Sequence, residues 1–389
     1  MGSAAFRRAI VVGPPVAQIL IVNYIIHLIP KFPNFAKACA KHFQFDRLLT
    51  MKAAYYGGSR QIDIRECVPV PPSAGQVRVR VSHCGICGTD LHVYLGDLDH
   101  RIRLPEVIGH EGSGTIAELG PGVEGFAAGD PVVVMPIISC GQCPACDAGN
   151  YHVCHQLKVI GIEAPGAMQS SWTVPANLLF PLPRTMDLQQ AALIEPVAVA
   201  CHDIRMGELQ KGEYTVVLGG GPIGALIAIV AKHKGARVLV TEINPFRIAM
   251  LRRLGLEVVD PRQPGWVERV MEETGGAGAD VVFEVTGVAA GAEMMTKAAK
   301  VRGRIVIVGV FAKPAPVDIY KIFARELRLF GARVYQREDF AEAIEIVASG
   351  AIPGHELITN VLPLDQLRHG LDQMATGGDV MKILIDCQT

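Results

Sequence analysis

Short runs of alternating apolar and polar residues, separated by glycine and proline, follow one another from Met51 to about residue 190. Alternation with a period of two places every second side chain on the same face of a strand, and glycine and proline mark the turns between strands. Examples of such runs are Gln76–Ser82, Gly114–Glu118 and Pro131–Met135. This part of the chain is therefore predicted to be a β-rich domain.

The pattern changes near Gln190, where Ala191–Met206 has the apolar spacing of a helix. Strand-like and helical segments then alternate, which predicts βαβ units and a parallel sheet. Helices are expected at Pro222–Lys234 and Pro245–Leu254. The expected strands are Thr215–Gly219, Arg237–Glu242, Asp280–Thr286, Arg304–Val310 and Leu327–Val334. Six such strands make a complete doubly wound sheet, and the pattern identifies these five, so the predicted fold class is α/β.

A chain of 389 residues exceeds what one hydrophobic core usually supports, so two domains are expected. The last segment is helical in pattern over Asp339–Ala348 and strand-like over Met381–Ile385, and it is too short to fold alone. Lys and Arg number 37 against 38 Asp and Glu, and no basic tail is present. This balance gives no reason to expect a nucleic-acid or acidic partner.

Residues 1–50 differ from the rest, because no acidic residue precedes Asp46 and Val16–Ile29 is almost wholly apolar. A membrane span needs roughly 20 apolar residues, and this run is shorter and interrupted by polar residues. A signal peptide is one interpretation of the basic residues before the run. We favour the alternative that Met51 is the native start and that the preceding segment is translated upstream sequence.

Two short segments bring together a thiolate, an imidazole and a carboxylate. The first reads Gly85-Ile86-Cys87-Gly88-Thr89-Asp90, and the second reads Gly109-His110-Glu111. Such a ligand set can leave one position of a tetrahedral zinc open, where an alcohol can bind and lose its proton. Cys84 and Cys87 are also formally a C-x-x-C pair, which is typical of redox or zinc-finger chemistry.

Four further cysteines, out of ten in the chain, are closely spaced: Cys140, Cys143, Cys146 and Cys154. Four thiolates can fill a closed zinc site that excludes water and performs no chemistry. Two disulfides are the alternative, which a reducing compartment would disfavour. The spacing therefore predicts a structural zinc.

A glycine-rich turn follows the strand expected at Thr215–Gly219 and opens the helix expected after it. A lone G-x-G-x-x-G is weak evidence, but here the next strand ends in an acid, Glu242, as the dinucleotide fingerprint requires. The carboxylate can accept both ribose hydroxyls and would repel a 2′-phosphate, which favours NAD over NADP, although Arg247 lies nearby. The predicted cofactor-binding residues are Gly219, Gly221, Pro222, Ile223, Gly224, Glu242 and Arg247.

With these motifs in this order, the chain from Met51 onward resembles the zinc-dependent medium-chain dehydrogenases/reductases, in particular the sorbitol, threonine and butanediol dehydrogenase branch. The resemblance implies a GroES-like β-rich catalytic domain and a Rossmann NAD-binding domain. The predicted limits are an N-terminal extension at residues 1–50, a catalytic zinc domain at 51–200, a Rossmann domain at 201–336, and a segment at 337–389 that completes the catalytic domain.

The resemblance also implies site residues. Cys87 and His110 would bind the catalytic zinc, and Cys84 would be a small buried residue. Where the alcohol dehydrogenase branch has a second cysteine, this chain has Glu195, so the remaining ligand is Glu111, Glu195 or a water held by one of them. Thr89 would pass the substrate proton through the cofactor ribose to His92, with Asp90 orienting the relay or a metal ligand.

The implied activity is NAD- and zinc-dependent oxidation of a secondary alcohol to a ketone, with a polyol, a vicinal diol or a sugar acid as substrate. One alternative is an amino alcohol, as in the L-threonine 3-dehydrogenases. Another is a redox sensor that binds zinc and NAD without turnover, although a sensor would not need Thr89 beside Cys87. The family also implies a cytoplasmic homodimer or homotetramer that does not act at a membrane.

Overall fold

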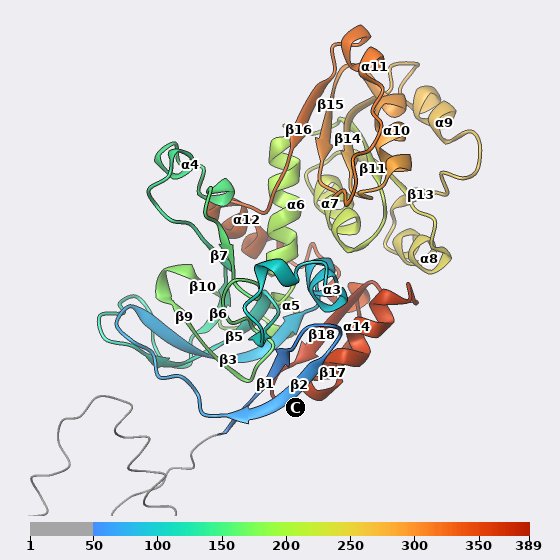
Figure 1. The fold of residues 1–389 in the computed structure, drawn as a ribbon. Coiled ribbons are helices and arrows are strands. Elements are labelled where there is room, and N and C mark those ends of the chain that lie inside the picture. The colour runs from blue at the N-terminus through green and yellow to red at the C-terminus, as the bar shows by residue number, and fades with distance from the viewer. Residues whose placement is uncertain (1–49) are drawn as a thin grey trace, which may run out of the picture. The chain divides into compact units, whose positions relative to one another are not determined.

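The computed structural model describes residues 50–389 and places most of their strands in two large sheets (Figure 1). The expected N-terminal extension, apart from Thr50, lies outside the described residues. Met51–Thr389 form one compact unit. None of the helices described in residues 50–389 is both long enough and apolar enough to cross a bilayer.

The β-rich part contains a mostly antiparallel sheet of seven strands, in the order β10-β6-β5-β3-β18-β17, with β9 also paired to β3. Its strands are β3 (Gln76–Gly85), β5 (Glu111–Leu119), β6 (Pro131–Val134), β9 (Ser171–Pro175), β10 (Leu179–Pro181), β17 (Ile358–Pro363) and β18 (Lys382–Asp386). A second sheet holds β1 (Met51–Tyr56), β2 (Ile62–Cys67) and β4 (Glu106–Val107), and a third holds β7 (Ile137–Ile138) and β8 (Lys158–Val159). Two of the three strands expected here from alternation lie within β3 and β5. The third corresponds to β6, which ends one residue before the expected Met135.

Strand β3 shows why alternation identified this sheet. Val77, Val79 and Val81 are buried, whereas Arg78 and Arg80 between them are not. The buried valines belong to the core of the β-rich part, so a shift of one residue would expose them.

The second large sheet has six parallel strands in the order β13-β12-β11-β14-β15-β16. They are β11 (Tyr214–Leu218), β12 (Arg237–Thr241), β13 (Glu257–Val259), β14 (Ala279–Glu284), β15 (Ala299–Ile307) and β16 (Arg328–Gly331). This is the predicted doubly wound sheet. The pattern did not identify β13, because three residues are too few to show a period.

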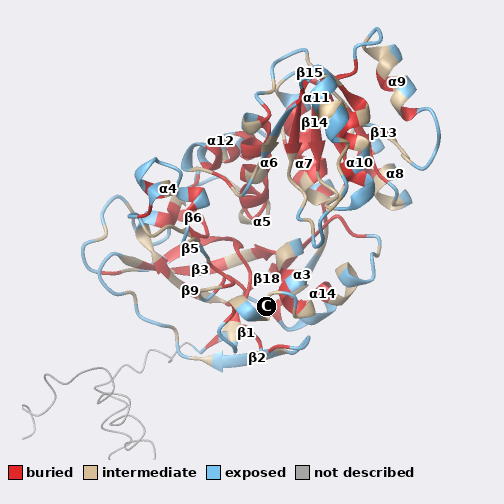
Figure 2. Cartoon of the chain, turned by 45° about the horizontal axis from the view of Figure 1, so that its top comes forward, coloured by how far each residue is buried: buried red, intermediate tan, exposed pale blue. Residues whose placement is uncertain are grey.

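Both faces of this sheet are covered, as Figure 2 shows by the buried colour of its central strands. Val217 of β11 packs in a core with the helices α6 and α7, whereas Val216 and Leu218 belong to a core with α9 and α10. The helices of this part are α6 (Ile194–Met206), α7 (Pro222–His233), α8 (Pro245–Arg253), α9 (Trp266–Glu273), α10 (Ala289–Ala298), α11 (Ile319–Ala324) and α12 (Arg337–Ala348). The remaining helices are α3 (Gly88–Leu95), α4 (Pro144–Asp147), α5 (Leu188–Ala191), α13 (Gly354–Leu357) and α14 (Leu367–Ala375).

Several strands of the parallel sheet end before the predicted residue. The strand expected to reach Thr286 ends at Glu284, because the Glu284 carboxylate accepts the Thr286 and Gly287 N–H groups and turns the chain. The strand expected to reach Val334 ends at Gly331, and Val334 itself has a φ of 48°. A β-branched residue in this left-handed region is strained, so the chain has left the sheet by this point.

Two further expectations differ from the structure. The helix expected at residues 191–206 is α6, which begins at Ile194, whereas Ala191 is the last residue of α5. The strand expected at residues 304–310 is β15, which begins at Ala299 and ends at Ile307. The segment after α12 returns to the sheet of the β-rich part. There β18 pairs with β3, and Leu384 lies opposite Gly85. The domain limits at residues 200 and 336 stay predictions.

Candidate active site and metal centres

The sequence motifs that contain Cys87 and His110 meet at one place. Cys87 precedes the first residue of α3, and His110 and Glu111 lie where the chain enters β5. One ligand atom from each of these three residues lies within 4.8 Å of the others. Asp90 joins the two loops, because its carboxylate accepts the Cys87 N–H at 2.9 Å and the Gly109 N–H at 3.2 Å.

This group has the properties of a metal site. His110 and Glu111 are buried, and Nδ1 of His110 lies 3.5 Å from the Asp90 carboxylate. A carboxylate beside one ring nitrogen orients a metal-binding imidazole and leaves the other nitrogen for the ion. Sulfur, nitrogen and oxygen donors together suit zinc. The residues present therefore fit the expected ion.

A buried lysine forms part of the same site, and sequence reasoning missed it. Lys382, from β18, forms an ion pair with Glu111 and donates a hydrogen bond to the Ile86 carbonyl at 3.1 Å. Burial lowers the pKa of Lys382, but Glu111 and the Cys87 sulfur outweigh this and raise it above its usual value. Gly85 makes the room, because a Cβ there would lie 1.8 Å from Glu111 Oε2.

Glu195 lies near these residues but outside the group of three. It is the second residue of α6, and its Oε1 accepts a hydrogen bond from the Tyr335 hydroxyl at 2.7 Å. Burial raises the pKa of the Glu195 carboxyl to about 7, although His110 and the Tyr335 hydroxyl oppose the rise. Sequence reasoning missed Tyr335, which directly follows the strained Val334.

The expected relay residues both lie on α3. Thr89 Oγ1 is 3.7 Å from the Cys87 sulfur, so a hydroxyl does stand beside the metal-binding group. His92 follows one helical turn later and is exposed, with Nδ1 2.8 Å from the Asp97 carboxylate. Its exposure is compatible with proton release to water, and the relay stays a prediction. Cys84 is fully buried and is not one of the three grouped residues, as expected.

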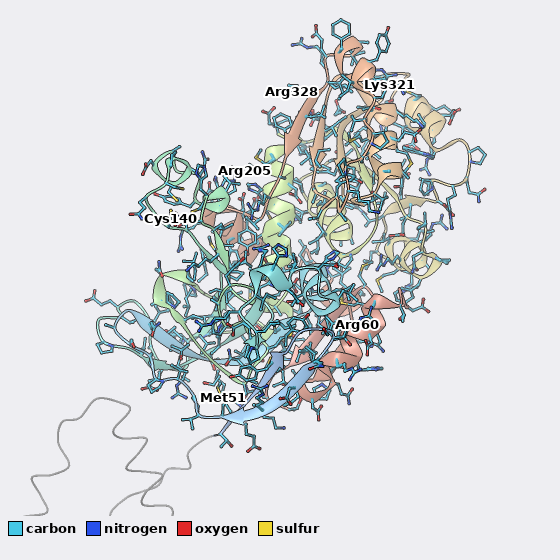
Figure 3. The ribbon with its side chains drawn as sticks, viewed as in Figure 1. Met51, Arg60, Cys140, Arg205, Lys321 and Arg328 are labelled. Atoms are coloured by element: carbon cyan, nitrogen blue, oxygen red, sulfur yellow. The ribbon has the colours of Figure 1, made fainter. Side chains whose placement is uncertain are left out.

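The second cysteine group forms a lobe around α4, in which Figure 3 labels Cys140. All four cysteines are free thiols, and three of their sulfur pairs are 3.5, 3.6 and 3.8 Å apart. Thiolates at the vertices of a tetrahedral zinc site are about 3.8 Å apart, given a Zn–S distance of about 2.3 Å. Backbone N–H groups of His155 and Cys146 lower the pKa of Cys143 to about 6, which favours its thiolate.

The glycine turn has the close packing that its motif predicts. Gly219 has a φ of 101°, and a Cβ on Gly224 would lie 1.8 Å from the Gly219 carbonyl oxygen. Gly221 caps α7, whose first two residues are Pro222 and Ile223, so free N–H groups stand at the helix N-terminus.

Glu242 reaches the same turn from the end of β12. Its Oε2 accepts the Gly220 N–H at 3.1 Å, and its Oε1 accepts the Ile243 N–H at 2.6 Å. Arg247 Nη1 lies 4.0 Å from the carboxylate. The acid and the glycine turn are therefore in direct contact.

Two family models match the chain. Residues 73–184 match the alcohol dehydrogenase GroES-like domain, and residues 222–349 match the zinc-binding dehydrogenase family. A 2-dehydro-3-deoxy-L-galactonate 5-dehydrogenase of Pseudoalteromonas atlantica is 48% identical over 87% of this chain and 99% of its own length. The chain belongs to the zinc-dependent alcohol dehydrogenase family.

Other members of the zinc-dependent alcohol dehydrogenase family are similar over the same length. The (R,R)-butanediol dehydrogenase of Bacillus subtilis is 33% identical over 86% of this chain and 99% of its own. The crystal structure of 2R,3R-butanediol dehydrogenase from that organism matches with a TM-score of 0.80 and 32% identity. The match covers 87% of this chain and 99% of that chain. A crystal structure from Escherichia coli, described as a short chain alcohol dehydrogenase in complex with NADH, matches with a TM-score of 0.79 and 29% identity. The match covers 86% of this chain and 99% of that chain.

The resemblance stated from the motifs is thus confirmed, as is the fold of a GroES-like domain with a parallel Rossmann sheet. The protein is an NAD(P)-dependent dehydrogenase of this family that acts on CH–OH groups.

Proposed function

We propose that this dehydrogenase oxidises a secondary alcohol of a sugar acid or a related polyol or vicinal diol to a ketone, with NAD as hydride acceptor. The observation that carries the substrate class is the 48% identity, over 99% of its length, to a 2-dehydro-3-deoxy-L-galactonate 5-dehydrogenase. Relatives named for a diol and a polyol are 33% and 31% identical. An amino-alcohol substrate is the second candidate, since an L-threonine 3-dehydrogenase of Pyrococcus horikoshii is 35% identical over 68% of this chain.

We assign Cys87, His110 and Glu111 as the residues that hold the catalytic zinc, because their ligand atoms already converge. When bound, the zinc supplies a Lewis acid that makes the substrate hydroxyl more acidic. Lys382 holds the Glu111 carboxylate through an ion pair. Tyr335 fixes one oxygen of Glu195 and leaves the other for a polar group of the substrate or a water. Cys140, Cys143, Cys146 and Cys154 would hold the structural zinc.

Proton removal is assigned to α3. The Thr89 hydroxyl, beside Cys87, would accept the substrate proton as it passes its own proton on towards His92, whose exposed imidazole would release one to water. Asp90 fixes the loop that leads into this helix through the Cys87 N–H group. Because free thiolates need a reducing compartment, we also assign the enzyme to the cytoplasm.

A substrate panel tests the proposed reaction. Purified enzyme with NAD would be given 2-dehydro-3-deoxy sugar acids, hexitols, 2,3-butanediol and L-threonine, and NADH formation would be recorded at 340 nm in each case. We expect the highest kcat/KM with a sugar acid. A higher value for L-threonine would overturn the substrate assignment, and turnover with none of them would overturn the whole class of substrates.

Replacing Glu242 with alanine is expected to move cofactor preference towards NADP by on the order of tenfold, a change of about 1.4 kcal/mol. The carboxylate is placed to accept the ribose hydroxyls and to repel a 2′-phosphate, and Arg247 would remain to meet that phosphate. The measurement is kcat/KM with NAD and NADP for one fixed alcohol. Glu257→Ala, an exposed acid at the start of β13, is the matched control. An unmoved ratio in Glu242→Ala would contradict the assignment.

The family resemblance implies a homodimer or homotetramer, and one exposed surface supports it. Ile319, Tyr320 and Phe323 of α11 are 68%, 75% and 77% exposed, and α11 leads directly into β16, the edge strand of the sheet (Figure 1). An apolar patch next to an unpaired strand is a typical protein interface. We expect sedimentation to give a multiple of 41.8 kDa and Phe323→Asp to lower it. A monomeric wild-type protein would refute the assignment.

A further inference from the structure

Glu284 is a fully buried acid at the end of β14 that the proposed reaction does not use. No cationic group within residues 50–389 forms an ion pair with it. Its Oε1 accepts the Thr286 N–H at 2.9 Å and also the Thr286 hydroxyl, and its Oε2 accepts the Gly287 N–H at 3.2 Å. Among the described residues, three donors and no cation face its two oxygens, so dipoles alone hold this carboxylate in place.

The surrounding chain is built to hold this carboxylate. A Cβ on Gly291 would lie 2.2 Å from Glu284 Oε1, and a Cβ on Gly309 would lie 2.7 Å from Oε2. The Glu284 carbonyl also accepts the Val308 and Gly309 N–H groups at 2.9 Å. Glu284 therefore joins the turn after β14 to the turn after β15. Such close packing against two glycines shows that space is kept for this side chain.

Both turns lie at the nucleotide crevice. In a doubly wound sheet, the ligand binds at the carboxyl ends of the strands where the strand order reverses, here between β11 and β14. The Gly219 turn touches the turn after β14, because a Cβ on Gly219 would lie 3.0 Å from Thr286 Cγ2. Glu242 follows β12, in the half of the sheet that binds the adenosine. The turns joined by Glu284 belong to the other half, where the nicotinamide binds.

We propose that Glu284 is a positioning residue for the nicotinamide half of the cofactor, and that its buried charge favours NAD⁺ over NADH. This inference rests on NAD being the cofactor, as proposed above. The oxidised nicotinamide ring carries a positive charge, which hydride transfer removes. A negative charge without a cationic partner acts strongly across a poorly screened interior, so it stabilises the charged ring and leaves the neutral ring unaffected. Its hydrogen bonds keep the two turns in place for either form.

Glu284→Gln tests the charge while nearly preserving the shape. Dissociation constants for NAD⁺, NADH and ADP-ribose would be measured by calorimetry on the full zinc-loaded protein. We expect NAD⁺ to bind on the order of tenfold more weakly and NADH about twofold more weakly. ADP-ribose, which lacks the nicotinamide, should bind unchanged. Equal losses for NAD⁺ and NADH would overturn the role of the charge, and an equal loss for ADP-ribose would overturn the positioning role.

Two further variants complete the test. Asp280→Asn removes a carboxylate from the opposite end of β14, so the ratio of the NAD⁺ and NADH constants should not move. Thr286→Val removes one hydrogen bond to Glu284 and leaves its charge, so NAD⁺ and NADH should weaken equally. If Glu284→Gln does not fold, unchanged binding in Thr286→Val would still overturn the positioning role. A wild-type protein that binds NADPH but neither NAD⁺ nor NADH would overturn the proposed cofactor itself, and the inference with it.

Discussion

Cys87→Ser is expected to abolish dehydrogenase activity, with kcat falling by at least a thousandfold, while the fold and NAD binding persist. The reason is that serine is a poor zinc ligand at neutral pH, since it keeps its proton where cysteine becomes a thiolate. Within residues 50–389 the proposed catalytic site has three protein ligands, and Cys87 is the one that would contribute sulfur. Losing it would leave His110 and Glu111, and we expect two ligands to be too few to hold the ion.

Metal analysis and NADH fluorescence provide the measurements for this variant. We expect one zinc per chain in place of two, with an unchanged dissociation constant for NADH. Cys84→Ser is the matched control, because Cys84 is buried three residues earlier and lies outside the group. It should keep both zincs and most of its activity. Near-normal turnover in Cys87→Ser would remove Cys87 from the mechanism.

Cys146→Ser is expected to act on stability, lowering the melting temperature by roughly 10 °C. Zinc binding to a closed cysteine site is coupled to local folding, so a missing thiolate costs several kcal/mol, and each kcal/mol moves the melting point of a large domain by about 2–4 °C. The sulfur of Cys146 is buried 3.6 Å from that of Cys143, and within residues 50–389 no fifth His, Cys, Asp or Glu belongs to this group. Purified molecules that remain folded should still oxidise the alcohol.

Calorimetric melting with a parallel activity assay distinguishes the two metal sites. Cys201→Ser provides the control, since Cys201 is a buried cysteine of α6 outside both groups. It should melt within a few degrees of the wild-type protein. An unchanged melting temperature together with lost activity in Cys146→Ser would show that the roles of the two cysteine sites are reversed.

The sequence predicted those parts of the site that short motifs encode. Cys87 and Thr89 are two residues apart at the start of α3, and the four cysteines of the structural lobe lie within fifteen positions, so their spacing alone brought them together. The same holds for the glycine turn, whose close packing at Gly224 needs only the adjacent strand and helix. Local sequence determines local geometry here.

Long-range contacts could not be predicted in the same way. Lys382 and Ile86 are 296 residues apart and meet only because β18 pairs with β3. The one available signal was a lysine within an apolar strand, which is unusual for a buried position. Both Glu111 and Glu195 lie in sequences where a metal ligand was expected. Only tertiary packing decides that Glu111 is the one whose carboxylate lies beside the Cys87 sulfur.

The position of β18 has a consequence for how the enzyme is made. This strand lies between β3 and β17, and its Lys382 is 296 residues beyond Ile86, the residue just after β3 that it contacts. Because a chain is synthesised from its N-terminus, residues 83–85 of β3 lack their β18 partners and Glu111 lacks Lys382 until β18 has left the ribosome. The cysteine lobe needs no such distant partner, because its four cysteines are close in sequence. A chain truncated before β18 would therefore leave β17 and the end of β3 without the strand between them, and such an open edge is prone to aggregation.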